Sequence, residues 1–174
     1  MSNLTNKLKR IKLLLLDVDG VLTDGSIIYD DNGSEIKSFN VKDGFGIRLL
    51  MSSGIEVGIV TGRASMALRH RLDNLGISLV FDGVKDKSSL LDLILKKKQV
   101  SAEEVAFVGD DLMDFQIMQK VGVSVAAKDG HAIVRDHADI VTQNRGGSGA
   151  VREVCESILK AQGLWESILE KYCS

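Results

Sequence analysis

Residues 11–21 read Ile-Lys-Leu-Leu-Leu-Leu-Asp-Val-Asp-Gly-Val, and this stretch decides how the rest of the chain is interpreted. Its apolar run is short and bounded by polar residues, which is typical of a buried strand. The run ends in two carboxylates, Asp17 and Asp19, followed by Gly20. Such a strand would deliver both acids to the carboxyl edge of a sheet, where open α/β sheets bind ligands. Two acids there are costly unless a metal ion or a reaction uses them.

Strand-like and helix-like patterns alternate along the chain, which predicts an α/β fold: a doubly wound, Rossmann-like parallel sheet. We expect strands at residues 11–16, 57–60, 79–81, 105–108, 123–125 and 140–141. We expect helices at residues 45–53, 65–75, 86–98, 112–121 and 149–162. The 174 residues contain no linker, internal repeat or low-complexity tract, so residues 1–174 are expected to form one domain.

Composition excludes several classes of protein. The net charge of −2 argues against a nucleic-acid-binding surface. No apolar run approaches the roughly 20 residues that span a membrane, and the first ten residues lack the apolar core of a signal peptide. We therefore expect a cytoplasmic protein. The two cysteines, Cys155 and Cys173, are too few and too far apart for a disulfide framework or a zinc site.

Residues 23–41 interrupt the alternation of strands and helices. They contain Asn32-Gly33 between two runs of β-prone residues, which is a strong signal for a hairpin. The hairpin is inserted between the first strand and the first helix, so it should lie above the acidic edge as a flap or an oligomer contact. A decorative surface hairpin is the alternative. Ile27, Ile28, Tyr29 and Phe39 favour a buried contact, because a lone hairpin cannot cover them.

Polar groups also follow three later strands, and a parallel sheet would bring them to the same edge. Thr61 opens the sequence Thr-Gly-Arg, whose hydroxyl and backbone N–H groups suit a phosphate. Lys87 lies at the start of a predicted helix. Asp110, Asp111 and Asp114 follow another strand, and clustered acids suit Mg²⁺.

Each of these signals has an ordinary structural alternative. Thr61 is also a plausible helix N-cap, Lys87 a plausible surface lysine, and Asp111 and Asp114 plausible stabilisers of a helix start. The complete set is harder to explain in that way. Like-charged carboxylates at ~4 Å repel by about 4 kcal/mol at an effective dielectric near 20, and a divalent ion with Lys87 would offset this. The expected ligand is therefore Mg²⁺ together with a phosphate.

These four groups resemble the motifs of the haloacid dehalogenase superfamily of phosphotransferases, over essentially the whole chain. The spacing leaves no room for a cap domain, so the chain resembles the capless subgroup, in which oligomerisation closes the site. The resemblance implies that Asp17 is the nucleophile, that Asp19 is the general acid and base, and that Thr61 and Lys87 hold the phosphate. It places Mg²⁺ on the Asp17 carboxylate, the Asp19 backbone carbonyl and the Asp110 carboxylate. Asp111 and Asp114 would support the metal from outside its direct ligands.

More narrowly, residues 17–24, 39–47, 61–63, 108–112 and 146–156 resemble the octulosonate 8-phosphate phosphatases of lipopolysaccharide biosynthesis. These are typically homotetramers whose hairpins form a central barrel. The resemblance implies substrate contacts from Asp19, Asn40, Val41, Lys42, Asp43, Gly44, Arg63, Arg71 and Lys87. The arginines Arg63 and Arg71 suit a sugar-acid carboxylate, which guanidinium binds with two hydrogen bonds. Lys42 and Asp43 would contact sugar hydroxyls.

The chain departs from this subgroup at its end. Members often finish in a flexible, glycine-containing tail that reaches a neighbouring site, whereas residues 164–172 predict an amphipathic helix whose apolar side packs. Three other functions remain open: a nonulosonate 9-phosphate phosphatase, a receiver-type signalling domain, and a non-catalytic oligomerisation module. Asp19 disfavours the receiver, because a long-lived phospho-aspartate needs no general acid. The complete motif set disfavours the non-catalytic module.

Overall fold

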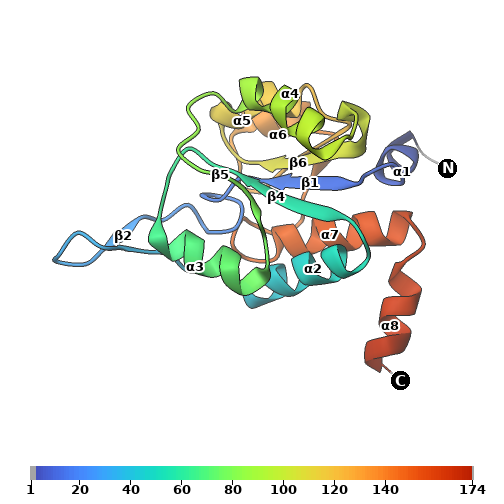
Figure 1. The fold of residues 1–174 in the computed structure, drawn as a ribbon, viewed down its shortest axis with the longest axis horizontal. Coiled ribbons are helices and arrows are strands. Elements are labelled where there is room, and N and C mark those ends of the chain that lie inside the picture. Colours follow the sequence, from blue (N-terminus) through green and yellow to red (C-terminus); the bar gives the residue numbers. More distant parts are fainter. Residues whose placement is uncertain (1–2, 174) are drawn as a thin grey trace.

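A six-stranded parallel sheet forms the centre of the computed structural model, which describes residues 3–173 (Figure 1). The strand order is β5-β4-β1-β6-β7-β8, and each neighbouring pair is parallel. The strands are β1 (Leu13–Leu16), β4 (Glu56–Val60), β5 (Leu79–Phe81), β6 (Val105–Gly109), β7 (Val123–Ala126) and β8 (Ile140–Val141). The predicted fold class is confirmed, and β1, which leads into the two acids, lies between β4 and β6.

Helices cover both faces of the sheet (Figure 1). On one face lie α2 (Val41–Ser52), α3 (Met66–Leu75) and α7 (Ala150–Ala161). On the other lie α4 (Lys87–Lys98), α5 (Leu112–Met118) and α6 (Ala132–His137). The short helix α1 (Asn3–Leu8) contacts α7 and β7, a 3₁₀ turn η1 (Ala102–Glu104) precedes β6, and α8 (Trp165–Cys173) projects beyond α7.

The four leucines of β1 contribute to the hydrophobic core on both faces of the sheet. Side chains of a strand alternate between faces, and a parallel sheet is buried on both, so four consecutive leucines are all enclosed. Leu14 and Leu16 belong to the cluster that includes residues of α2, α3 and α7. Leu13 and Leu15 belong to the cluster on the side of α4 and α5, with Phe107. Packing on both faces of the sheet therefore fixes β1, and with it the position of Asp17 directly after the strand.

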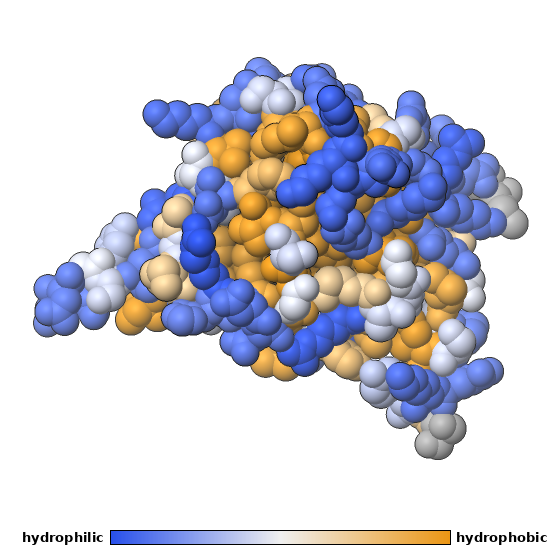
Figure 2. All heavy atoms as spheres, in the orientation of Figure 1, coloured by the Kyte–Doolittle hydropathy of each residue, from blue (hydrophilic) through white to orange (hydrophobic). Residues whose placement is uncertain are grey.

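The predicted hairpin is present between β1 and α2, as the antiparallel pair β2 (Ile28–Tyr29) and β3 (Glu35–Ile36). Its turn contains Gly33 at φ +79°, a left-handed conformation that glycine adopts without strain. The hairpin projects from the body of the molecule (Figure 1), and apolar residues reach the surface at its base (Figure 2). Within one chain Phe39 packs partly buried against the core, whereas Ile27, Ile28 and Tyr29 of the expected set are each about half exposed, as is Ile36.

Several element boundaries differ from the sequence expectation. Helix α2 begins at Val41 rather than at residue 45, because the Asn40 side chain caps it. Helix α5 ends at Met118 rather than at residue 121, and the helices α1 and α6 were not expected. The predicted C-terminal helix is present as α8, with Leu164, Trp165 and Ile168 partly buried against the core. Within residues 3–173 no helix is both long enough and apolar enough to cross a membrane.

Candidate active site

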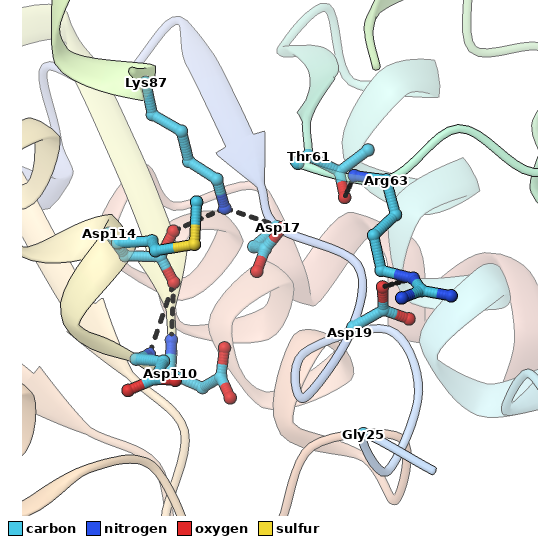
Figure 3. Close-up of a pocket in the computed structure, with 11 residues that line it drawn as sticks. Asp17, Asp19, Gly25, Thr61, Arg63, Lys87, Asp110 and Asp114 are labelled. Atoms are coloured by element: carbon cyan, nitrogen blue, oxygen red, sulfur yellow. Dashed lines mark hydrogen bonds and ion pairs between the residues drawn. The ribbon is translucent and has the colours of Figure 1, made fainter. Parts of the chain in front are cut away.

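Four groups from four strand ends line one pocket of about 260 Å³ at the carboxyl edge of the sheet (Figure 3). Asp17 follows β1, Thr61 follows the adjacent β4, and Asp110 follows β6 on the other side. Lys87 is the first residue of α4, which comes after β5. The remaining lining residues are Asp19, Gly25, Gly62, Arg63, Asp111, Met113 and Asp114. Strand order alone therefore explains why residues up to 97 positions apart in the chain share this pocket.

Lys87 is held between two carboxylates. Its side chain is 3 % exposed, and its Nζ lies 2.8 Å from Oδ1 of Asp17 and 2.6 Å from Oδ1 of Asp114. Burial by itself would lower the pKa of Lys87, but the two negative charges outweigh it and raise the pKa. The lysine is therefore a fixed positive charge in the pocket rather than a solvated surface residue.

Asp114 fastens the loop after β6 to this lysine. Its side chain is 1 % exposed, and Oδ2 accepts hydrogen bonds from the backbone N–H of Asp110 at 2.9 Å and of Asp111 at 3.4 Å. Asp111 is exposed and caps α5, since its Oδ1 accepts from the N–H of Leu112 at 2.8 Å. The two acids that were expected to play similar parts thus differ: Asp114 positions Lys87 and Asp110, while Asp111 caps a helix.

The pocket holds more negative charge than one lysine balances. Carboxylate oxygens of Asp17, Asp110 and Asp114 lie within 4.8 Å of one another. Burial, with a contribution from Asp114, raises the pKa of Asp17 to about 6 although Lys87 opposes the shift. Burial and the charges of Asp17 and Asp114 raise the pKa of Asp110 to about 8. Both carboxylate oxygens of Asp114 are engaged, Oδ1 by Lys87 and Oδ2 by the backbone N–H of Asp110, so Asp17 and Asp110 are the carboxylates that fit a divalent cation.

Gly20 allows the loop after β1 to approach Asp110. Its φ of +85° lies in the left-handed region, and a Cβ at this position would overlap the Asp110 carboxylate. The glycine of the Asp-Val-Asp-Gly sequence is thus required by the close packing of the two acidic loops.

Asp19 is held by a ring of charged side chains that was not predicted from the sequence. Its Oδ1 pairs with Nζ of Lys37, which lies 2.7 Å from Oε1 of Glu35. Nη2 of Arg63 donates to Oε2 of Glu35 at 2.8 Å, and Nε of Arg63 lies 3.6 Å from Oδ2 of Asp19. Burial would lower the pKa of Lys37, but the carboxylates of Asp19 and Glu35 raise it. The alternate spacing of Glu35 in β3 and Lys37 directly after that strand was the available signal.

Thr61 is placed by the sheet. Its N–H donates to the carbonyl of Phe81 at 2.9 Å, and its own carbonyl accepts from the N–H of Val84 at 3.0 Å. The residue that precedes α3 as its N-cap is Ser65, so the alternative interpretation of Thr61 as a cap is wrong. Its Oγ1 accepts only a long contact of 3.4 Å, from the N–H of Arg63. The hydroxyl is therefore available to a ligand.

The run Asn40 to Gly44, expected to contact substrate, does not line this pocket. Asn40 caps α2, since its Oδ1 accepts from the N–H groups of Lys42 at 2.8 Å and Asp43 at 3.3 Å. Val41, Gly44 and Arg71 line a separate hollow on the surface of α2 and α3. Arg71 donates there to the carbonyl of Asn40 at 3.0 Å. Lys42 is exposed beside α7, in another hollow.

Asp43 requires a correction. We expected it to contact sugar hydroxyls, but it is 1 % exposed and accepts from the N–H groups of Gly149 at 3.2 Å and Arg152 at 2.7 Å. Burial raises the pKa of Asp43, and these hydrogen bonds oppose the shift. The carboxylate thus caps the start of α7, where the helix dipole favours an anion.

Comparisons with known proteins identify related chains. The family description "haloacid dehalogenase-like hydrolase" matches residues 80–154. The 3-deoxy-D-manno-octulosonate 8-phosphate phosphatase KdsC of Escherichia coli is 49% identical over 157 residues, which cover 90% of this chain and 84% of that one.

Solved structures agree with this similarity. The phosphatase of the same name from Moraxella catarrhalis, in complex with magnesium, phosphate and KDO, is 41% identical with a TM-score of 0.96, covering 99% of both chains. That from Yersinia pestis is 45% identical with a TM-score of 0.92, covering 93% of this chain and 88% of that one.

Proposed function

The chain belongs to the family of 3-deoxy-D-manno-octulosonate 8-phosphate phosphatases, within the haloacid dehalogenase-like hydrolases, and from this membership we propose that it hydrolyses that phosphate ester. The products are the free sugar acid and inorganic phosphate. The observation that carries the proposal is the convergence of Asp17, Thr61, Lys87 and Asp110 in one pocket. Such a set matches the needs of phosphoryl transfer, where positioning and charge stabilisation dominate.

In the proposed first step, Asp17 attacks the phosphorus atom. A bond forms between its carboxylate oxygen and phosphorus, and the bond between phosphorus and the sugar oxygen breaks. Asp19 gives its proton to the departing sugar oxygen. Lys87, which already contacts Asp17 in the free protein, holds the phosphate oxygens together with Thr61 and a nearby backbone N–H group.

In the second step, water hydrolyses the aspartyl phosphate. Asp19, now a carboxylate, takes a proton from the water as its oxygen bonds to phosphorus, and the bond to Asp17 breaks. Phosphate leaves, and both aspartates return to their starting forms. A single residue thus serves as acid and then as base, which is why Asp19 must stay close to the same phosphorus atom throughout.

Mg²⁺ fits the surplus negative charge of the pocket. The carboxylates of Asp17 and Asp110 and the backbone carbonyl of Asp19 would hold it. When bound, the ion neutralises charge and orients the phosphate. Asp114 then contributes by fixing Lys87 and the Asp110 loop rather than as a ligand.

The proposal extends to assembly and location. We propose a single hydrolase domain that forms a homotetramer through its hairpins, in the cytoplasm, in lipopolysaccharide biosynthesis. The exposed apolar residues of the hairpin support self-association. In such an assembly the surface formed by Asn40, Val41, Lys42, Gly44 and Arg71 would contact the sugar part of a substrate bound to a neighbouring subunit. The location and pathway follow from the family resemblance.

Asp17→Asn tests the reaction directly. With Mg²⁺ present, we expect phosphate release from the octulosonate phosphate to fall at least about 10³-fold, because the nucleophile is lost. Asp92→Asn, an exposed carboxylate on α4 outside the pocket, should keep wild-type activity. Undiminished activity of Asp17→Asn would overturn the mechanism. A wild-type preference for a nonulosonate 9-phosphate over the octulosonate ester would keep the chemistry and replace the proposed sugar.

A further inference from the structure

Lys37 is a buried cation in an otherwise exposed segment. Residues 24–34 of the hairpin region are exposed, yet the side chain of Lys37, one residue after β3, is only 2 % exposed. Lysine is almost never buried unless it is paired, because removing an ammonium group from water is costly. The burial of Lys37 in a short hairpin therefore indicates that its ammonium group has specific charged partners.

The partners of Lys37 form a closed ring of two acids and two bases. Its Nζ contacts Oδ1 of Asp19 and lies 2.7 Å from Oε1 of Glu35. Glu35 in turn pairs with Nη2 of Arg63 at 2.8 Å, and Nε of Arg63 faces Oδ2 of Asp19 at 3.6 Å (Figure 3 draws this last pair). The ring joins the hairpin to the loop after β1 and to the turn after β4.

The two oxygens of Asp19 are therefore in different surroundings. Oδ1 is engaged by Lys37, while the distance of 3.6 Å leaves Oδ2 beyond a hydrogen bond from Arg63. Asp19 itself lies in the loop after β1, beside Gly20 with its left-handed backbone. Without the Lys37 contact, only the longer 3.6 Å ion pair with Arg63 would orient the carboxylate group of Asp19. A proton-transferring side chain works best when a third group orients it.

We propose that Lys37 is a positioning residue for catalysis: it fixes Oδ1 of Asp19 so that Oδ2 stays directed to the leaving oxygen and then to water. This inference rests on the proposed acid and base function of Asp19. It makes the hairpin part of the catalytic arrangement within its own chain, in addition to any contact with other subunits. The alternative is that the ring only anchors the hairpin.

Lys37→Met distinguishes a positioning role from a purely anchoring role when it is assayed on two substrates. The sugar phosphate and p-nitrophenyl phosphate differ in their need for a general acid. The sugar oxygen must be protonated as it leaves, whereas p-nitrophenolate leaves without help. We expect kcat/KM, which reports the first phosphoryl transfer, to fall about 100-fold for the sugar phosphate. For p-nitrophenyl phosphate we expect a loss of less than about fivefold. Glu35→Gln is the matched control: it weakens the same hairpin anchor but leaves the contact between Lys37 and Asp19, and should lose less than about fivefold on both substrates.

A double-mutant cycle with Asp19→Ala provides a second readout. Lys37→Met should lower the sugar-phosphate rate by less than about threefold in that background, since its target is gone. Lys37→Arg, which keeps the charge, should recover at least about tenfold of the activity lost in Lys37→Met, and it also serves if the Met variant fails to fold.

Equal losses on both substrates, equal losses in both backgrounds, no recovery by Lys37→Arg, or a Glu35→Gln variant as impaired as Lys37→Met would each overturn the proposal. If the wild-type protein hydrolyses neither substrate, the proposed function itself fails. That result is distinguishable from an active wild type whose Lys37→Met variant stays fully active.

Discussion

A single carboxylate, Asp114, links the two sides of the candidate site. It accepts the Lys87 ammonium on one oxygen and the backbone N–H of Asp110 on the other, and it is almost completely buried. Asp114 matters for stability because its removal would leave the buried Lys87 ammonium with one fewer carboxylate partner. Lys87 would keep only Asp17 as a partner, and a buried cation that loses one of two carboxylates is strongly destabilised.

Asp114→Ala should therefore lower the free energy of unfolding by about 3 kcal/mol. Urea unfolding followed by circular dichroism at pH 7 measures this. Asp111→Ala is the matched comparison: it removes the exposed cap of the same helix and should cost about 1 kcal/mol. If the two variants are equally stable, Asp114 does not act as the buried partner of Lys87.

At the scale of elements, the strands, turns and site residues that could be predicted are those determined by residues close to them in the sequence. The apolar runs predicted the strands. The polar residues after them predicted that one edge of the sheet would bring together Asp17, Thr61, Lys87 and Asp110. A strand end needs only its own residues and the rule that parallel strands share an edge. The Asn-Gly turn was predictable for the same reason.

The features that were missed depend on partners distant in the chain. Asp43 is buried because α7, 106 residues later, places its N–H groups against the carboxylate. Lys37 is buried because it meets Asp19, 18 residues earlier. Nothing in the neighbouring sequence marks either side chain as enclosed. The start of α2 was missed because the residues before Asn40 resemble a returning strand, which hides the cap.

The contact between α1 and the sheet gives a prediction about pH. The Asp139 carboxylate accepts from Lys7 of α1 at 2.6 Å and from the N–H of Ser124 in β7 at 2.9 Å. Burial would raise the pKa of Asp139, but these hydrogen bonds outweigh it and hold the pKa below its usual 3.8. A carboxyl group whose pKa is lower in the folded state stabilises the protein at pH values above its unfolded-state pKa. This stability is lost as the pH falls through the folded-state pKa.

Asp139→Asn should thus be less stable than wild type at pH 7, with a difference that shrinks as the pH falls from about 5 to about 3. Urea midpoints across this range provide the measurement. Asp92→Asn, an exposed change on α4, should keep a constant offset. A constant offset for Asp139→Asn as well would contradict the ion-pair explanation.

At the scale of the whole molecule, the hairpin leaves apolar side chains exposed on a single chain. Ile28 and Ile36 face each other across β2 and β3, and they are 47% and 51% exposed. A two-stranded hairpin is marginal on its own, so this exposed apolar pair supports the proposed assembly through the hairpins.

Ile28→Asp should convert the proposed tetramer to a smaller species, because a charge would be buried at the contact. Size-exclusion chromatography with light scattering measures the mass. Ile133→Asp, at an exposed isoleucine on α6, should leave the mass unchanged. A wild-type protein that is monomeric, or an Ile28→Asp variant that remains tetrameric, would argue against assembly through the hairpins.

The pocket is separate from the surface formed by Val41, Lys42, Gly44 and Arg71, and this separation bears on how such an enzyme changes its substrate. The pocket contains the groups for phosphoryl transfer, while that surface lies on α2 and α3. Under the proposed role of this surface in binding the sugar, mutations that alter sugar preference would accumulate on those helices without disturbing the phosphate chemistry. In directed evolution, a library confined to Val41, Lys42, Gly44 and Arg71 would explore new sugar phosphates from an intact catalytic background. The architecture is in this sense modular, and substrate range can drift while the reaction is conserved.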